Sequence, residues 1–261
     1  MHAALWVSKT GLSAQDTKLT TISNNLANVS TVGFKRDRAV FQDLLYQKQR
    51  QPGGQSSENT QLPSGLQLGT GVRTVATQKV FTTGSLQVTE QPLDIAVNGR
   101  GFFQIQMPDG TLAYTRDGQF QVNSEGQVVT SNGFLMEPNI AVPPDADSIT
   151  ISRDGLVNIT VPGDPNPQQI GQITVADFIN PAGLESAGNN LFLETAASGA
   201  PIVGIGGQDG IGTLEQGMLE NSNVSAVEEL VNMITTQRAY EMNSKVVSTA
   251  DQMLQNLTQT L

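Results

Sequence analysis

Few residues in this sequence are able to do chemistry. His2 is the only histidine and cysteine is absent, so neither a histidine-based triad nor a thiolate metal site can form. Carboxylates are plentiful, and a pair of them could act in acid–base catalysis. However, Asp109, Asp117 and Asp154 each precede a glycine, a position where aspartate bonds its own backbone in a turn. We therefore predict no catalytic residue, no metal ligand and no cofactor.

Three glycine-rich stretches are interpreted as loops. The stretch "NGRGFF" (98–103) lacks the GxGxxG spacing of a nucleotide-binding turn, and no helical pattern follows it. The stretch "GIGGQDGIG" (204–212) has no Lys-Ser or Lys-Thr pair to hold a phosphate. The stretch "PGDPNPQQIG" (162–171) reads as a long loop because proline and glycine dominate it.

Charge is distributed unevenly along the 261 residues. The net charge of −10 argues against nucleic-acid binding. Residues 1–80 carry 9 Lys and Arg against 4 Asp and Glu, whereas residues 81–261 carry 5 against 20. This asymmetry indicates either a solvated acidic surface or attraction between copies, basic end to acidic body. The N-terminal residues lack a signal-peptide pattern, so we expect export, if it occurs, to proceed without cleavage.

Both ends of the chain carry a narrow helical stripe of apolar residues. In the first segment, Leu5, Leu12, Leu19 and Leu26 recur every seven residues. The last segment repeats the pattern over residues 224–260, and residues 221–223 offer N-cap candidates. A narrow stripe is typical of a coiled-coil seam rather than of a broad core face.

The middle of the chain has a different pattern. Turn signals recur about every eight residues over 99–136, at Asp109-Gly110, Asp117-Gly118, Glu125-Gly126 and Asn132-Gly133. Residues 149–161 read as a further hairpin, with its turn at Asp154-Gly155. Short alternating stretches between such turns predict an antiparallel all-β domain.

The sequence therefore predicts an α+β fold in three parts. Residues 1–30 and 222–261 form a discontinuous helical domain that pairs as a coiled coil, and residues 73–221 form the β-rich domain. Residues 31–72 are a linker whose polar part, 46–72, is an extended arm or a hairpin. We expect the helix pairs to pack between copies; the alternative is a two-helix stalk within a monomer.

The candidate functional residues belong to a subunit interface and to the arm. Amides next to an apolar seam can fix the register of packed helices, which places three asparagines in the first set. The predicted interface residues are Leu5, Leu12, Leu19, Ile22, Asn24, Asn25, Leu26, Asn28, Val227, Val231, Ile234, Met242, Val246, Met253 and Leu257. The predicted arm residues, which we expect to stiffen an assembly of copies, are Gln51, Pro52, Gly53, Gly54, Pro63 and Gly65.

Four segments resemble a known family. The terminal segments "SNNLANVSTVGFKR" (23–36) and "SAVEELVNMITTQRAYEMNSKVVSTADQMLQ" (225–255) are similar to the ends of bacterial flagellar axial proteins of the rod and hook. The blocks "LDIAVNGRGFFQI…DGTLAYTRDGQFQVNSEGQVV" (93–129) and "GLESAGNNLFLET" (183–195) resemble the family's β domain. A chain with room for one β domain, and an insert at 46–73, favour a subunit of the distal rod over a hook subunit.

This resemblance implies a structural subunit rather than an enzyme. Such subunits leave the cytoplasm unfolded through the flagellar type III export apparatus and build a hollow helical tube, a drive shaft through peptidoglycan and outer membrane. The implied partners are copies of itself, proximal rod subunits, hook subunits, and the peptidoglycan-ring and outer-membrane-ring proteins. The alternatives are a hook or proximal rod subunit, a secreted β-rich fibre or adhesin, and a cell-wall hydrolase.

Overall fold

The structure, a computed structural model, describes residues 2–53, 55–57, 60–61 and 63–259. These residues divide into two compact units, which we describe separately. Unit 1 comprises residues 1–27, 37–78 and 225–261, and unit 2 comprises residues 28–36 and 79–224. The order of helix, strands and helix agrees with the predicted α+β class.

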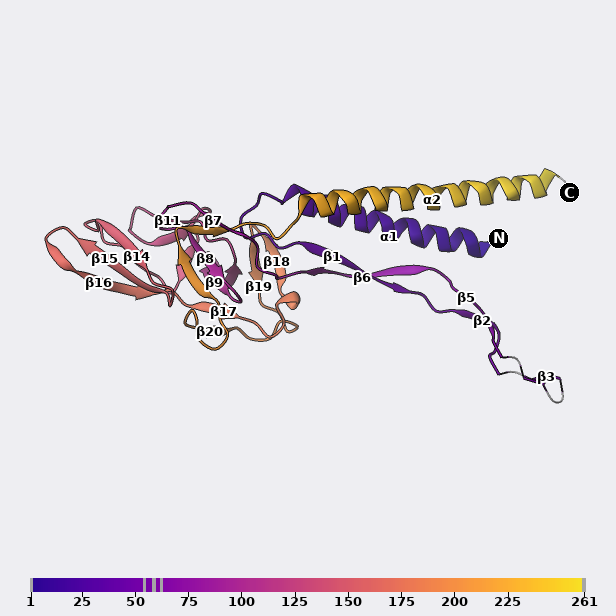
Figure 1. Cartoon of the computed structure of the whole chain (residues 1–261), viewed down its shortest axis with the longest axis horizontal. Helices are drawn as coiled ribbons and strands as arrows, with labels where there is room; N and C mark the ends of the chain where they lie inside the picture. Colours follow the sequence, from indigo (N-terminus) through magenta and orange to yellow (C-terminus); the bar gives the residue numbers. More distant parts are fainter. Residues whose placement is uncertain (1, 54, 58–59, 62, 260–261) are drawn as a thin grey trace. The chain divides into compact units, whose positions relative to one another are not determined.

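Unit 1 contains the two long helices. Helix α1 covers His2–Ala27 and helix α2 covers Ala226–Gln259. They lie side by side and run in opposite directions (Figure 1). A Cβ added to Gly11 of α1 would lie 3.2 Å from the side-chain nitrogen of Asn243 of α2, so the backbones approach closely there. Neither helix, in the part of the chain that the structure describes, is long and apolar enough to cross a membrane.

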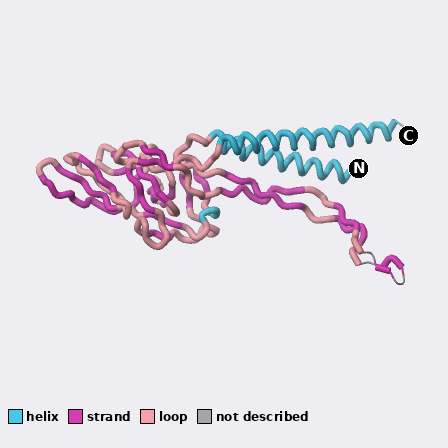
Figure 2. Tube along the Cα trace, viewed as in Figure 1, coloured by secondary structure: helices cyan, strands magenta, loops and turns pink. Residues whose placement is uncertain are grey.

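The remainder of unit 1 is a run of short paired strands (Figure 2). Three pairs follow one another: β1 with β6, β2 with β5, and β3 with β4. The carbonyl oxygen of Leu45 accepts a hydrogen bond from Thr70, which joins the first two pairs. The strand bounds are β1 (Asp37–Asp43), β2 (Gln47–Arg50), β3 (Gln55–Ser57), β4 (Thr60–Gln61), β5 (Leu66–Leu68) and β6 (Val72–Lys79).

Unit 2 is built from antiparallel strands, as the turn spacing predicts. Its largest sheet has nine strands, with β9 and β10 near the centre. The strands of this sheet are β9 (Phe102–Gln106), β10 (Leu112–Thr115), β11 (Phe120–Val122), β12 (Val128–Thr130), β13 (Leu135–Glu137), β17 (Val175–Asp177), β18 (Glu185–Gly188), β19 (Leu191–Leu193) and β20 (Ile202–Gly204). A single 3-10 turn, η1 (Pro181–Gly183), interrupts the described part of this region.

Smaller sheets complete unit 2. Strands β14, β15 and β16 form one sheet, β8 pairs with β21, and β7 pairs with β22. Their bounds are β7 (Leu86–Val88), β8 (Ile95–Asn98), β14 (Ser148–Ile151), β15 (Leu156–Val161), β16 (Asp164–Gln172), β21 (Thr213–Gln216) and β22 (Met218–Glu220). The pairing of β7 with β22 joins the beginning of this unit's long segment to its end.

The core of unit 2 lies on both faces of the large sheet. Strand β9 is buried on each side: Phe103 and Ile105 belong to the larger apolar cluster, and Phe102 belongs to a smaller aromatic one. In the aromatic cluster, Phe102 meets Phe178 edge to face with ring centroids 5.9 Å apart. Aromatic pairs of this geometry add stabilisation beyond the apolar area that they bury.

One predicted loop is a strand. Residues 162–171 were expected to form a loop, but most of them lie in β16, which pairs with β15. Proline has no N–H for a ladder, so a proline-containing strand belongs at the edge of a sheet, and β16 is such an edge. Two register shifts along the β15–β16 pair accommodate the irregular backbone. The other two predicted loops are confirmed in part, at 99–101 and 205–212, because Asn98 ends β8, Phe102 and Phe103 begin β9, and Gly204 ends β20.

Candidate assembly surface and buried charge cluster

Small and polar residues fill the buried side of the two helices in unit 1. On α1 the buried positions include Ser8, Ala14 and Thr21, and on α2 they include Glu229 and Thr236. With about 100° between successive residues, positions seven apart share a face of a helix. The most buried positions are therefore neither the leucines of the seven-residue stripe of α1, which are half-buried, nor the apolar stripe of α2.

The apolar stripe of α2 lies on the surface of the described chain. Val227 is 73% exposed and Ile234 is 50% exposed, although both are large aliphatic residues. The other exposed members of the stripe are Leu230, Val231, Met242, Val246 and Met253. Met242, Val246 and Met253 also line a shallow groove with Ala4 of α1. A contiguous exposed apolar surface of this kind marks an interaction site.

The predicted interface residues of α1 lie deeper. Ile22 is buried, while Leu5, Leu12, Leu19 and Leu26 are half-buried. Trp6, which is not among the predicted interface residues, is 56% exposed and is the more prominent apolar side chain on the surface of α1. The side chain of Leu257 lies outside the described part of the chain.

The asparagines at the end of α1 have partners within the same chain. Asn25 is buried; its Nδ2 donates to the carbonyl oxygen of Asp37 at 2.9 Å, and its Oδ1 accepts from the amide of Asp37 at 2.8 Å. Asn24 donates to the Asp37 carboxylate at 3.4 Å. The Oδ1 of Asn28 accepts from the hydroxyl of Thr31 at 3.1 Å, in unit 2. In the described chain, Asn25 thus fixes the start of β1 against α1.

Replacing Asn25 with alanine is expected to loosen that attachment. Both hydrogen bonds from Asn25 are lost, which leaves the amide and the carbonyl group of Asp37 without that partner. The free energy of unfolding should fall by about 1–3 kcal/mol. Hydrogen exchange measured by mass spectrometry should show faster exchange across 36–43. Asn24→Ala, at an exposed position with a longer bond, serves as the control. Equal exchange in the two variants would contradict the assignment.

The described arm residues are mostly exposed. Gln51, Pro52, Gly53 and Pro63 lie at the surface, and Gly54 lies outside the described residues. Gly65 is half-buried, and a Cβ there would lie 2.5 Å from the carbonyl oxygen of Arg50. The two strands that flank the end of the arm therefore approach closely at Gly65.

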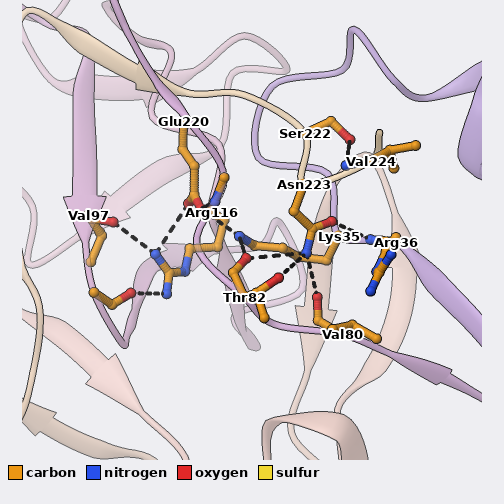
Figure 3. A network of polar contacts seen from close by, with 12 residues as sticks. Lys35, Arg36, Val80, Thr82, Val97, Arg116, Glu220, Ser222, Asn223 and Val224 are labelled. Carbon is orange, nitrogen blue, oxygen red and sulfur yellow. Dashed lines mark hydrogen bonds and ion pairs between the residues drawn. The ribbon is translucent and has the colours of Figure 1, made fainter. Parts of the chain in front are cut away.

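Unit 2 holds a buried cluster of charges that no sequence pattern predicts (Figure 3). Glu220 lies between two cations, with its Oε1 2.6 Å from Lys35 Nζ and its Oε2 3.2 Å from Arg116. All three side chains are buried. The same Oε1 accepts from the amide of Gly84 at 2.7 Å. One carboxylate cannot neutralise two cations, so the three side chains together keep one net positive charge.

Arg116 links this cluster to the large sheet and its neighbours. Its guanidinium donates to the carbonyl oxygens of Val97, at 3.0 Å, and Gly99, and it lies 5.4 Å from the centre of the Phe102 ring. Its Nε has no hydrogen-bond partner among the described residues. Burial lowers the pKa of Arg116 and that of Lys35, an effect that Glu220 opposes in both.

The chemistry available to the cluster is structural. Its polar atoms are turned toward one another and toward backbone carbonyl groups, so the cluster ties distant segments together. Among the described residues, no group of three or more His, Asp and Glu side chains is placed to hold a metal ion. A sequence signal for this cluster is weak, because Lys35 and Glu220 are separated by 185 residues.

The cap of α2 also differs from the prediction. The N-cap candidates were residues 221–223, but the hydroxyl of Ser225 accepts from the amide of Glu228, at 3.5 Å. The sequence did contain the signal, since Ser225 and Glu228 have the S-x-x-E spacing of a capping box. Asn223 is used differently: its amide group binds the backbone of Arg36 and Val80 (Figure 3).

Comparison with known proteins identifies the family. Three family models match: "Flagella basal body rod protein" over residues 5–35, "Flagellar hook protein FlgE/F/G D1 domain" over 96–159, and "Flagellar basal body rod FlgEFG protein C-terminal" over 215–260. The flagellar basal-body rod protein FlgG of Buchnera aphidicola subsp. Schizaphis graminum is 56% identical over 99% of this chain and 100% of its own length. The chain belongs to the flagellar basal-body rod protein family.

More distant rod proteins extend the match. The FlgG proteins of Caulobacter vibrioides and Bacillus subtilis are 50% and 38% identical, each over 98% of this chain and of their own length. The predicted flagellar resemblance and the prediction of a structural protein rather than an enzyme are therefore confirmed by the relatives. As a basal-body rod protein, the chain is a structural component that assembles into the rod with other flagellar components.

Proposed function

We propose that the chain is the subunit of the distal rod and polymerises into a hollow helical drive shaft. In this proposal the shaft carries motor torque through the peptidoglycan and the outer membrane to the hook. The observation that carries the proposal is the exposed apolar stripe of α2, with Val227, Ile234 and Met242 at the surface. An apolar face this long is costly in water, and packing against further copies would bury it.

The terminal helices are the proposed polymer contacts. Residues 1–30 and 222–261 would act as one discontinuous helical domain that pairs as a coiled coil, with residues 73–221 as the outer β domain and 31–72 as the linker. The exposed stripe residues of α2 would meet neighbouring copies directly, as would the accessible parts of Leu5, Leu12, Leu19 and Leu26. Ile22 and Asn25, which are buried in the chain itself, would hold this face in position.

The proposed partners follow from the place of a distal rod. They are other copies of the chain, proximal rod subunits, hook subunits, and the proteins of the peptidoglycan and outer-membrane rings. We propose export in the unfolded state by the flagellar type III apparatus, without cleavage. Nucleic acid is not among the partners, which agrees with the net charge of −10.

Electron microscopy of basal bodies tests this assignment. Deleting the gene is expected to leave basal bodies that retain a short proximal rod but lack the distal rod and the hook, and the parent gene should restore both. A deletion strain that builds the complete rod and hook would contradict the proposal. A strain that lacks only the hook would identify the chain as a hook subunit instead.

We also propose that residues 46–72 stiffen the shaft. In the described part of this segment, strand pairs β2–β5 and β3–β4 hold it as a ladder, and the side chains of β2 and β5 are exposed. Its Gln, Ser and Thr side chains can bond to neighbouring copies, at about 1 kcal/mol net for each hydrogen bond. Many such bonds in every copy would resist the sliding that bending requires.

Deleting residues 49–68 is accordingly expected to give a shaft that bends. The tube should still assemble because the helices remain, and its curvature can be measured on purified basal bodies by electron microscopy. The control replaces the same residues with an equal number of glycines and serines, which keeps the length but not the strand pairing; we expect it to bend as well. Straight shafts in both variants would refute the stiffening role.

A further inference from the structure

Four passages of the chain connect unit 1 to unit 2. They lie at residues 27/28, 36/37, 78/79 and 224/225. On the side of unit 2, these passages belong to three segments, residues 28–36, 79–85 and 220–224, which we call the collar. Any load that travels along the backbone from one unit to the other must therefore pass through the collar.

One side-chain amide joins all three collar segments. Asn223 Oδ1 accepts from the amide of Arg36 at 2.8 Å. Asn223 Nδ2 donates to the carbonyl oxygen of Val80 at 2.7 Å, and to the carbonyl and hydroxyl oxygens of Thr82 at 3.2 and 3.0 Å. The amide of Val80 in turn donates to the carbonyl oxygen of Arg36 at 2.9 Å. The passages at 36/37, 78/79 and 224/225 therefore each lie within two residues of Asn223 or of a residue that it binds (Figure 3).

Glu220 attaches the collar to the body of unit 2. Its backbone carbonyl accepts from the amide of Gly33 at 2.8 Å, and its carboxylate binds Lys35, Gly84 and Arg116. Through Arg116 the attachment reaches the carbonyl oxygen of Val97 in β8. The remaining passage, at 27/28, leads into the segment that is held at Gly33 and Lys35.

The backbones of the collar are packed without spare room. Gly33 has φ +69°, and a Cβ there would lie 2.7 Å from the backbone of Arg116. A Cβ on Gly84 would collide with the carbonyl oxygen of Asn221. Segments so close, and joined at Glu220 by buried bonds to Lys35 and Arg116, move together rather than as separate hinges.

We propose that the collar carries torque within each subunit and that Asn223 is its positioning residue. The proposal rests on the proposed role as a torque-carrying rod subunit. Four separately attached passages would let a unit twist on flexible connections, and the twist would absorb part of the torque. When one amide fixes the passages to one another, they transmit rotation as a single body. Glu220 and its two cations hold that body to the sheet.

Two variants and one control separate this role from a general effect on stability. Asn223→Ala removes every side-chain bond at the position. Asn223→Asp keeps an acceptor for the amide of Arg36 but loses the donors to Val80 and Thr82. The control, Asn180→Ala, removes an exposed amide of unit 2 that bonds the carbonyl oxygen of Ala197 at 2.9 Å, away from the collar.

Hydrogen exchange on the purified full-length chain gives the first readout. In Asn223→Ala the amides of Arg36 and Val80 should exchange about tenfold faster, while amides of β9 and β10 keep their rates. In Asn223→Asp only residues 80–82 should exchange faster, because Arg36 keeps its acceptor. Asn180→Ala should leave all collar amides unchanged.

Rotation under load gives the second readout. Cells with Asn223→Ala should assemble complete rods by electron microscopy and swim at normal speed in thin medium. In medium made viscous with an added polymer, where motor torque is high, they should lose motility, while the parent and Asn180→Ala cells keep it. Asn223→Asp should lie between them.

Several results would overturn the proposal. They are collar exchange no faster than in Asn180→Ala, normal motility at high load, loss of protection throughout unit 2, and failure to assemble rods despite normal exchange. Loss of protection throughout unit 2 would make Asn223 a folding residue, and failure to assemble would place it in a contact between copies. Failure of the distal-rod function shows separately, because the gene-deletion strain would then still build complete rods.

Discussion

Replacing Ile234 with aspartate is expected to abolish rod assembly while the β-rich unit keeps its fold. Ile234 is half-exposed on the apolar stripe of α2, which we propose packs against neighbouring copies. An unpaired carboxylate buried in such a contact costs about 3–5 kcal/mol. Each copy would contribute this cost, so a polymer held by many equal contacts should not form.

Electron microscopy of basal bodies and a motility assay measure the outcome. Ser244→Asp is the matched control, because Ser244 is an exposed residue of the same helix whose position lies off the apolar stripe. Hydrogen exchange of β9 and β10 in the purified chain should equal that of the parent in both variants. Normal rods with Ile234→Asp would show that this stripe is not a contact between copies.

Replacing Glu220 with glutamine should have the largest effect on the stability of unit 2. Lys35 and Arg116 would then lie buried with no anion between them. Removing one partner of a buried charge cluster costs about 3–5 kcal/mol, because the remaining charges stay in a medium of low polarity. Hydrogen exchange of β9 and β10 in increasing denaturant measures this loss, separately from α1 and α2.

Lys35→Met is the informative comparison. It leaves Glu220 and Arg116 as a pair of equal and opposite charges, and Glu220 still accepts from the amide of Gly84. The carbonyl oxygen of Thr82, which Lys35 binds, keeps its bond from Asn223. We therefore expect Lys35→Met to lower the free energy of unfolding by much less than Glu220→Gln does. The reverse order would refute this reading of the cluster.

Lys35 is also expected to make the free energy of unfolding depend on pH. Burial lowers the pKa of Lys35 from its ordinary value of 10.5. The unfolded chain then binds that proton more tightly than the folded chain, so the free energy of unfolding rises with pH toward 10.5. Lys35→Met should remove this rise, which denaturant titrations at several alkaline pH values can detect.

Local patterns predicted the order of elements and many of the turns. Asp109-Gly110, Glu125-Gly126 and Asn132-Gly133 each lie between strands that pair directly with each other. Asp117-Gly118 does not, because β10 and β11, which flank it, pair with other strands. A turn signal is a property of a few residues and does not say which strands become neighbours.

Contacts between distant segments were beyond the sequence pattern. The residues around Lys35 and around Glu220 give no sign that the two side chains bond across 185 residues. A single charge near an apolar run usually lies at the surface.

The sequence also did not predict which residues of the two helices are buried. The seven-residue stripe indicated two seams, but its leucines on α1 are only half-buried, whereas Ile22, Asn25 and small residues such as Ser8 and Ala14 are buried. An apolar stripe shows that one face of a helix is apolar, but it does not show which surface that face packs against.

The collar also bears on how such a chain can change over generations. Strand β7 pairs with β22, and Asn223 binds Val80, so the first and last residues of the segment 79–224 are held together. A segment with adjoining ends behaves as an insertion: it can be lengthened, shortened or exchanged for another without altering the spacing of the chain that enters and leaves it. Descendants of one ancestral gene could therefore keep the same helices and acquire different bodies.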